Sequence, residues 1–186
     1  YIIETFPQYG AGLTRLEDNE MVNEKLKLLD TTPSSPPPSQ GGDTEGVENR
    51  PGVMTAQEKI KRFPLAPEII PGGQWFNSSP FTLQELRGKV VLVDFWTYTC
   101  INCIRTLPYL KSWHETYADK GLVILGVHSP EFEFEKNAEN VAKAIRDFDL
   151  RYPIVQDNNF ATWQAYQNRY WPAKYLVDKD GFIRYT

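Results

Sequence analysis

The chain has 186 residues, which allows one ordinary domain with an appendage but excludes a large multidomain enzyme. Lysine and arginine number 20 against 24 aspartate and glutamate, and this net charge of -4 argues against a nucleic-acid partner, which would need a basic face. No stretch reaches the roughly 18 apolar residues that span a bilayer. The two cysteines exclude a disulfide-dense scaffold and a four-cysteine zinc site.

The first 63 residues are expected to precede the folded domain. Residues 1–30 contain one short amphipathic helix, in which Met21, Leu26 and Leu29 recur close to helical spacing. Residues 31–63 form a flexible linker rich in proline, glycine and serine, because such a segment buries too little apolar surface to offset its ordering entropy. A tether to a further domain and a plain disordered tail both fit this composition. The chain begins with tyrosine, which indicates a processed chain or a piece of a longer protein.

Residues 64–186 alternate between strand and helix patterns, which predicts an α/β fold with a mixed sheet flanked by helices. The run Lys89–Phe95 is β-branched and aromatic throughout, as in a central strand buried on both faces. Asp180 and Gly181 are typical of a hairpin turn. In chain order we expect a strand at 89–95, helix at 107–117, strand at 122–127, helix at 141–148, strand at 152–155, helix at 160–166, and strands at 174–177 and 182–185.

The motif Cys100-Ile101-Asn102-Cys103 lies where the buried strand gives way to a helix. Two thiols at this spacing can close a disulfide with little backbone movement, and a helix N-terminus favours a thiolate on the first of them. Cys100 is therefore the expected nucleophile, and Cys103, shielded one turn deeper in the helix, is the expected resolving thiol. The motif alone also fits two reduced core cysteines or half of a zinc site.

Further residues in chain order make this segment resemble the thioredoxin superfamily. Val93-Asp94-Phe95-Trp96 precedes the cysteines, Pro108 follows five residues after the second, and Trp171-Pro172 stands where that family has its cis-proline. The closing hairpin is similar to that of the TlpA-like branch. The segments 95–108 and 168–175 resemble the DipZ proteins, in which a CcdA-type membrane electron-transfer domain precedes an extracytoplasmic thioredoxin-like domain.

The resemblance implies a thioredoxin-like domain over 64–186 and roles for four further residues. Asp94 corresponds to a buried acid of raised pKa that serves Cys103 as proton acceptor or donor. Trp96 would pack beside the disulfide, exclude water and belong to the substrate-binding residues together with Trp171 and Pro172. Trp171 and Pro172 would share a cis bond and present backbone to a substrate strand. No cofactor is implied beyond a redox-active disulfide between the two cysteines.

Some positions depart from the family pattern. Ile101-Asn102 replaces the Gly-Pro of ordinary thioredoxins, so the direction of electron flow is not inherited. Thr106 stands where many TlpA-like proteins have glutamate, and Gly126 stands where thioredoxins have a lysine near the buried acid. The chain also ends at Thr186, before the last strand and helix that the fold requires, so we expect a truncated C-terminus or an edge supplied otherwise.

Three other features bear on metal binding, peroxidase chemistry and partner docking. His114 and His128 are expected to be ordinary residues and not metal ligands, because copper-carrying relatives use a different cysteine spacing. Thr97 stands three residues before the first cysteine, as in peroxiredoxins, but Val93 stands where their proline would be. The acidic and aromatic loop at 131–135 fits a docking rim or, as we favour, a solvated face.

The sequence therefore predicts a thiol-disulfide oxidoreductase, chiefly a reductase of protein disulfides outside the cytoplasm. The DipZ resemblance implies a CcdA-type membrane electron donor, membrane tethering, and a role in cytochrome c biogenesis or redox homeostasis. Two alternatives remain open. One is a thiol peroxidase of the same fold, and the other is a non-catalytic thioredoxin-like interaction module like those that precede NHL-repeat propellers.

Overall fold

The computed structural model describes Glu58 and residues 63–186. The short helix expected within 1–30 and nearly all of the linker expected at 31–63 lie outside the described residues. Within the described part every helix is too short or too polar to cross a bilayer. The strands are β1 (Trp75–Phe76), β2 (Val90–Trp96), β3 (Leu122–His128), β4 (Ile154–Gln156), β5 (Ala173–Val177) and β6 (Ile183–Tyr185). The helices are α3 (Ile101–Tyr117), α4 (Ala138–Asp147) and α5 (Ala161–Ala165), with 3-10 turns η1 (Ala118–Lys120) and η2 (Glu133–Lys136).

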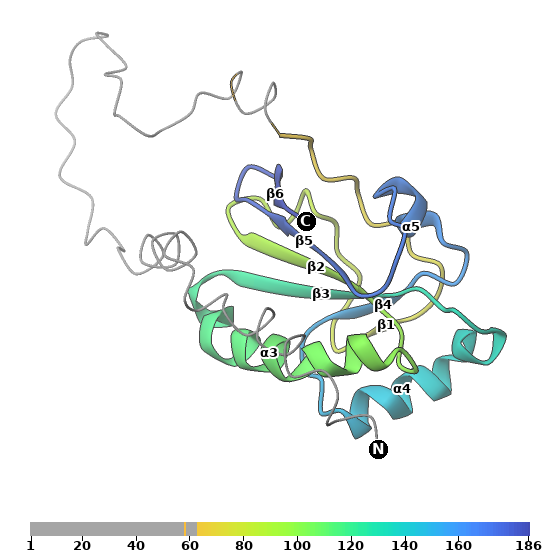
Figure 1. Cartoon of the computed structure of the whole chain (residues 1–186). Coiled ribbons are helices and arrows are strands. Elements are labelled where there is room, and N and C mark those ends of the chain that lie inside the picture. The colour runs from red at the N-terminus through yellow and green to blue at the C-terminus, as the bar shows by residue number, and fades with distance from the viewer. Residues whose placement is uncertain (1–57, 59–62) are drawn as a thin grey trace, which may run out of the picture. The chain divides into compact units, whose positions relative to one another are not determined.

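The strands form one mixed sheet in the order β1-β4-β3-β2-β5-β6 (Figure 1). β2 runs parallel to β3, and β3 runs parallel to β4, while β5 is antiparallel to β2. The chain therefore leaves β2 after Trp96 and β3 after His128 at the same edge of the sheet. Because β5 runs the other way, the loop that enters it at Ala173 also lies at this edge.

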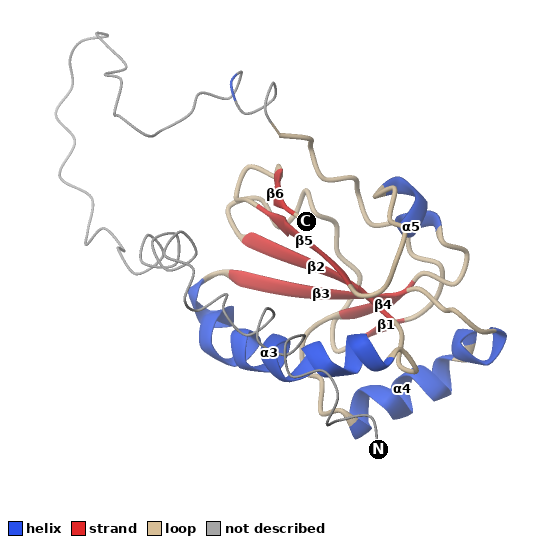
Figure 2. Cartoon of the chain, viewed as in Figure 1, coloured by secondary structure: helices blue, strands red, loops and turns tan. Residues whose placement is uncertain are grey.

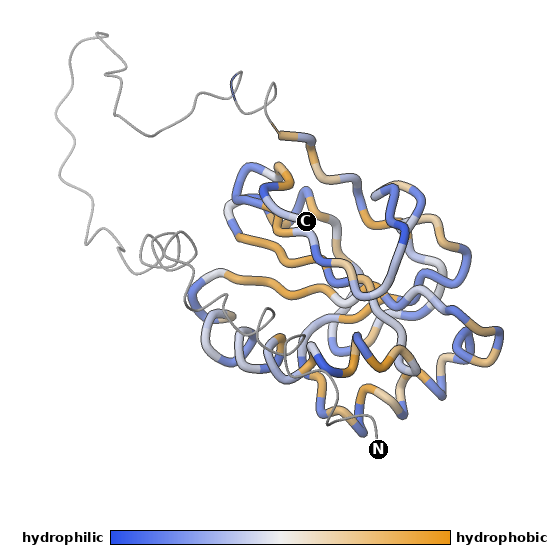
Figure 3. Tube along the Cα trace, in the orientation of Figure 1, coloured by the Kyte–Doolittle hydropathy of each residue, from blue (hydrophilic) through white to orange (hydrophobic). Residues whose placement is uncertain are grey.

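The central strands are held by burial on both faces, as their continuous apolar sequence predicts. Side chains alternate along β2, so that Val91, Val93 and Phe95 pack on one face while Leu92 and Trp96 pack on the other. Figure 2 shows α3 and α4 along one face of the sheet and α5 on the opposite one. In Figure 3 the most hydrophobic stretches follow β2 and β3. Full burial of each such large apolar side chain contributes about 1.5–3 kcal/mol.

Helix α3 extends from the edge that carries the cysteines. Leu107 and Leu110 are buried against the sheet together with Cys103. After η1 the chain turns at Gly121, whose φ of 95° is the left-handed conformation that glycine adopts without a steric penalty. The helix thus fixes the cysteines over the sheet at one end and returns the chain to β3 at the other.

The predicted fold class and element order are confirmed. α3 begins at Ile101 instead of 107, and α4 begins at Ala138 instead of 141. The other differences are at short elements. β4 begins at Ile154, two residues later than expected, because Pro153 has no amide hydrogen to donate to the ladder. β1 has two residues and carries no periodicity that a sequence could reveal. The loop expected at 131–135 contains the 3-10 turn η2.

Candidate active site

The two cysteines differ in exposure because of their places on α3. Cys100 is the N-cap residue, half-buried, and its Sγ accepts a hydrogen bond of 3.3 Å from the backbone N–H of Cys103. Cys103 lies in the first turn, is fully buried, and packs in the core beneath the helix. Both thiols are free in this structure. The geometry places Cys100 toward solvent and Cys103 behind it.

The buried thiol needs a proton acceptor before it can react as a thiolate. Burial raises the pKa of Cys103 strongly, and the hydrogen bond with Cys100 and the negative charge of Asp94 raise it further. A backbone contact from Thr97 lowers it in part. Cys103 is therefore a protonated thiol in the reduced protein.

The difference in burial gives a direct labelling prediction. Iodoacetamide should modify Cys100 at neutral pH at least tenfold faster than Cys103, because Cys103 is 0% exposed and protonated. Mass spectrometry of peptides from briefly labelled, reduced protein measures the two rates. Urea-unfolded protein is the control, in which the rates should converge. Equal rates in the folded protein would contradict the assigned roles.

Asp94 lies in the middle of β2, and its neighbours across the sheet are Gly126 on β3 and Lys174 on β5. Its side chain is 1% exposed, and its Oδ1 accepts a hydrogen bond of 2.8 Å from the Lys174 Nζ. Burial raises the pKa of Asp94, and the Lys174 ammonium opposes part of that rise. Its second oxygen, Oδ2, has no hydrogen-bond partner within the described part of the chain. The predicted buried acid is thus present and paired on one side.

Lys174 and Thr106 were not predicted as partners of the site. Lys174 Nζ also donates to Thr106 Oγ1 at 3.1 Å, and the Thr106 hydroxyl donates to the backbone carbonyl of Cys103 at 2.9 Å. The acid is therefore connected through Lys174 to the helical turn that carries the resolving thiol. No pattern in the sequence marks Lys174 as the partner of Asp94, because the pairing depends on the register of β5 against β2.

Gly126 lies opposite Asp94 on β3, and the side chains packed around it leave no room for a lysine at this position. A Cβ at Gly126 would lie 3.0 Å from Trp96 Nε1 and from Ile154 Cγ1, and 3.4 Å from Tyr152 Cε2. A side chain of any length at this position would displace these packed groups. This chain thus lacks the family lysine at Gly126 on β3 and has Lys174 on β5, the other neighbour of β2, as the cation beside the acid. Lys174 also binds Thr106, the other position that departs from the family pattern.

The other predicted residues lie around the cysteines with different exposures. Trp96 is 0% exposed and packs with Cys103, so it covers the inner side of the site and does not face solvent. The Trp171–Pro172 peptide bond is cis, as predicted. Trp171 and Pro172 are half-buried, and the Trp171 indole rests on Trp163 with ring centroids 4.3 Å apart.

The two histidines differ in environment. His128 is fully buried at the end of β3, where Tyr98 stacks on it at 5.5 Å and Thr97 Oγ1 lies 3.3 Å from its Nε2. Burial lowers the pKa of His128 to about 4, although the charge of Glu135 opposes the shift. His128 is therefore neutral at physiological pH. His114 lies on α3 with its ring against Tyr152, and the described residues contain no cluster of three metal-ligating side chains.

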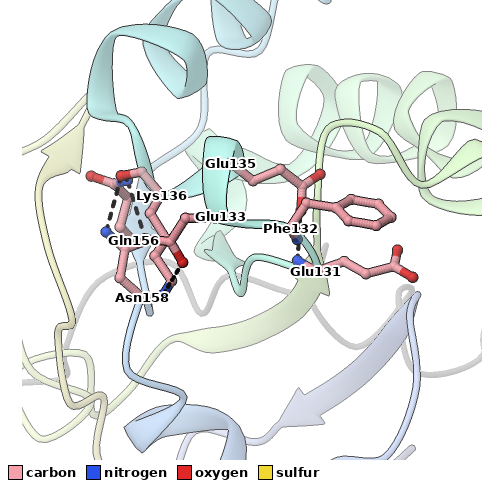
Figure 4. A network of polar contacts seen from close by, with 7 residues as sticks. All are labelled: Glu131, Phe132, Glu133, Glu135, Lys136, Gln156 and Asn158. Carbon is pink, nitrogen blue, oxygen red and sulfur yellow. Dashed lines mark hydrogen bonds and ion pairs between the residues drawn. The ribbon is translucent and has the colours of Figure 1, made fainter.

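Glu135 is a buried carboxylate, so the solvated face favoured for the whole loop at 131–135 is wrong at this residue. Its Oε1 accepts a hydrogen bond of 2.6 Å from the Thr99 hydroxyl, and its Oε2 accepts from the backbone N–H groups of Glu131 and Phe132 (Figure 4). Burial raises the pKa of Glu135, but these bonds and one from Thr97 outweigh it and hold the pKa below its usual value. Glu135 therefore ties η2 to the turn that precedes Cys100.

Comparison with known proteins identifies the family. Residues 59–186 match the sequence profile of the AhpC/TSA family. The chain belongs to this family. Its fold is shared by the thioredoxin-like superfamily protein SPOA0173, with a TM-score of 0.61 and 27% identity over 65% of this chain and 83% of that one. A thioredoxin-like protein solved in its oxidised form gives a TM-score of 0.62 and 28% identity over 66% and 82% of the two chains.

Curated relatives include one thiol-disulfide oxidoreductase of similar length and two much longer proteins. DipZ of Mycobacterium bovis is 50% identical over 161 residues, which are 79% of this chain but 23% of DipZ, so the chain spans about a quarter of that relative. YkuV of Bacillus subtilis, a thiol-disulfide oxidoreductase, is 29% identical over 64% of this chain and 80% of its own. NHL repeat-containing protein 2 of Bos taurus is 40% identical over 66% of this chain and 17% of its own. This AhpC/TSA member has a thioredoxin-like fold, and its relatives include the thiol-disulfide oxidoreductase YkuV.

Proposed function

We propose that this chain reduces protein disulfides outside the cytoplasm and is itself reduced by a membrane electron-transfer partner of the CcdA type. The observation that carries the proposal is the pairing of a solvent-facing Cys100 with a buried Cys103 next to the Asp94–Lys174 pair. This arrangement separates the attacking thiol from the resolving thiol and provides a proton acceptor for the second.

The reaction consists of two exchanges. The Cys100 thiolate attacks one sulfur of the substrate disulfide, forms a mixed disulfide, and releases the first substrate sulfur as a thiolate. Cys103 then gives its proton to Asp94 and attacks Cys100 Sγ. This closes the Cys100–Cys103 disulfide and releases the second substrate sulfur, which takes up a proton. Two electrons have passed to the substrate, and a dithiol of the membrane partner restores the enzyme by the reverse exchanges.

The membrane partner and the location rest on relatives. DipZ shares 50% identity with this chain, and the chain corresponds to 23% of it, which leaves room in that relative for further domains. ResA of Bacillus cereus, a thiol-disulfide oxidoreductase, is 29% identical over 71% of this chain. The chain has two cysteines, Cys100 and Cys103, and once they have formed a disulfide a reductase needs an external dithiol to return them to thiols. Cytochrome c biogenesis and general redox homeostasis are the two roles that fit a reductase of this kind.

The redox potential tests the direction of electron flow. We expect a value near that of thioredoxin, about -270 mV, because little stabilises the reduced anion beyond the helix N-terminus. The Lys174 ammonium donates hydrogen bonds to Asp94 and Thr106, so we expect it to add little stabilisation to a thiolate at Cys100. Equilibration of the purified protein against glutathione or dithiothreitol buffers measures the potential. A value above about -180 mV would favour an oxidase or isomerase instead.

The alternatives are tested separately. A peroxidase would use the Thr97 hydroxyl at Cys100, whereas this hydroxyl lies against His128 and Glu135. Stopped-flow mixing with peroxide should therefore oxidise the protein much more slowly than a protein disulfide does. The similarity to NHL repeat-containing protein 2 supports the second alternative, a non-catalytic thioredoxin-like interaction module. Catalysed insulin reduction with dithiothreitol would exclude a purely non-catalytic module.

A further inference from the structure

We propose that Phe132 and Phe134 form an aromatic platform beside Cys100 that binds an apolar side chain of the substrate polypeptide, preferably next to a basic residue. The proposal rests on the proposed function, since it names the substrate class that this site receives. The aromatic platform is defined as these two rings. It extends the recognition of substrate beyond the backbone at Trp171 and Pro172.

The rings of Phe132 and Phe134 are exposed to solvent and stack on each other. Phe132 is 48% exposed and Phe134 is 54% exposed, and their rings stack with centroids 5.5 Å apart and an interplanar angle of 5°. Adjacent exposed apolar rings usually indicate an interaction surface, because burying them in a partner releases their hydration water. Aromatic side chains also lose little conformational entropy on binding.

The backbone beneath the aromatic platform is fixed by a buried charge. The Glu135 carboxylate accepts from the N–H groups of Glu131 and Phe132, and its residue is 0% exposed. In Figure 4 the Phe132 ring and the Glu131 carboxylate point away from the group formed by Lys136, Gln156 and Asn158. The side chains of Gln156 and Asn158 hold the other end of η2 by donating to the Lys136 carbonyl at 2.9 Å and 3.1 Å. The loop is thus anchored at both ends while its rings remain outside.

The sheet topology places the aromatic platform on one side of Cys100. Cys100 follows β2, the aromatic platform follows β3, and Trp171-Pro172 precede β5, which flanks β2 on its other side. The turn before Cys100 contacts the loop that carries the aromatic platform, because the Tyr98 hydroxyl donates to the Phe134 carbonyl at 3.3 Å and Thr99 donates to Glu135. A polypeptide whose cysteine reaches Cys100 while its backbone lies at Pro172 therefore places its residues on the other side over the aromatic platform.

The charges at the aromatic platform select the partner. Exposed Glu131 and Glu133 alternate with the two rings, and Lys136 lies 2.7 Å from Glu133, which leaves Glu131 as the exposed carboxylate of this loop that lacks a paired cation among the described residues. A basic residue beside the apolar one would meet this carboxylate. Because the pair is solvent-exposed, its contribution is small and screened by salt. The apolar contact supplies the larger part of the affinity.

Short peptides in which one cysteine is disulfide-bonded to thionitrobenzoate test the proposal, because attack by Cys100 releases a coloured thiolate. The residues on either side of the cysteine are varied in turn between phenylalanine and serine, and between lysine and glutamate. Wild-type protein should react about tenfold faster with one phenylalanine peptide than with its serine counterpart. Phe132→Ser/Phe134→Ser should lose this preference while reacting with Ellman's reagent at the wild-type rate. Glu131→Gln should reduce the lysine preference by about two- to fivefold, and only at low salt.

Leu65→Ser is the matched control, because Leu65 is 56% exposed but pairs with Phe182 at the opposite end of the sheet. It should leave every rate unchanged. An unchanged peptide preference in the double variant, or an equal loss of rate with Ellman's reagent, would overturn the proposal. Binding of a peptide with serine in place of cysteine keeps this test separate from the redox function. It should shift the amide resonances of Phe132 and Phe134 even if the protein failed to reduce any disulfide, and no shift would also overturn the proposal.

Discussion

Replacing Asp94 with asparagine should slow product release from the Cys100 mixed disulfide by about 10²-fold, while the first attack by Cys100 stays nearly unchanged. Burial raises the pKa of Cys103, so this thiol cannot become a nucleophile without a proton acceptor. Asparagine keeps the shape of the side chain but cannot accept the proton. Single-turnover mixing of reduced protein with insulin, followed by acid quenching and mass spectrometry, separates the two steps.

Asp178→Asn is the control for this experiment. Asp178 pairs with Arg184 beyond the end of β5 that lies away from the cysteines, so its loss should leave both steps unchanged. If Asp94→Asn releases product at the wild-type rate, Asp94 is only a structural residue. If it slows the first attack as much as the release, the acid acts on Cys100 and the assigned roles are wrong.

The same variant has a second readout in stability. Because the folded-state pKa of Asp94 is raised, ionised Asp94 destabilises the folded protein, and this cost grows as pH rises from the unfolded pKa through the folded one. Asp94→Asn should therefore be more stable than wild type at neutral pH and equal to it in acid. Lys174 limits the gain, since it pairs with the carboxylate in the wild type and keeps 25% of its side chain in water. Urea unfolding at several pH values measures the difference.

The fold follows from local sequence patterns, and so does the position of the thiols. The apolar run at Lys89–Phe95 and the helical spacing after it are local signals, and each is strengthened by its neighbours in sequence. The site residues with a fixed offset from the cysteines, such as Asp94, could be assigned for the same reason. The greater shielding of Cys103 could be predicted as well, because it lies one turn deeper in the helix than Cys100, and Cys103 is indeed fully buried. The residues of other elements that pack on Cys103 and Trp96 could not be predicted.

The residues missed by sequence reasoning all act across large separations. Lys174 reaches Asp94 from 80 residues away, and Glu135 reaches Thr99 from 36 residues away. Neither contact leaves a periodic trace, and a lysine on a strand or a glutamate in a loop is ordinarily solvated. Only the register of β5 against β2, and the return of η2 to the cysteine turn, give these charges their partners.

Replacing Lys174 with methionine should move the pH dependence of product release to higher pH. Release requires ionised Asp94. Among the described residues, the titratable groups that face this acid are Lys174 from β5, Cys103 from α3, and Tyr152 before β4. Lys174 is the one cation among them and lowers the pKa of Asp94. Without it burial acts unopposed, so a larger share of Asp94 is protonated at a given pH. Release below the wild-type midpoint should fall about tenfold and recover at high pH.

Two further variants decide whether charge is responsible. Lys174→Arg retains the cation and should keep the midpoint close to that of the wild type, although the hydrogen bond to Thr106 changes in shape. Lys179→Met removes an exposed lysine from the turn after β5 and should leave the profile unchanged. A rate that falls equally at every pH in Lys174→Met would mean that Lys174 only packs the helix against the sheet. A shifted midpoint with an intact plateau would instead show that a lysine on β5 sets the proton affinity of the acid beneath the cysteines.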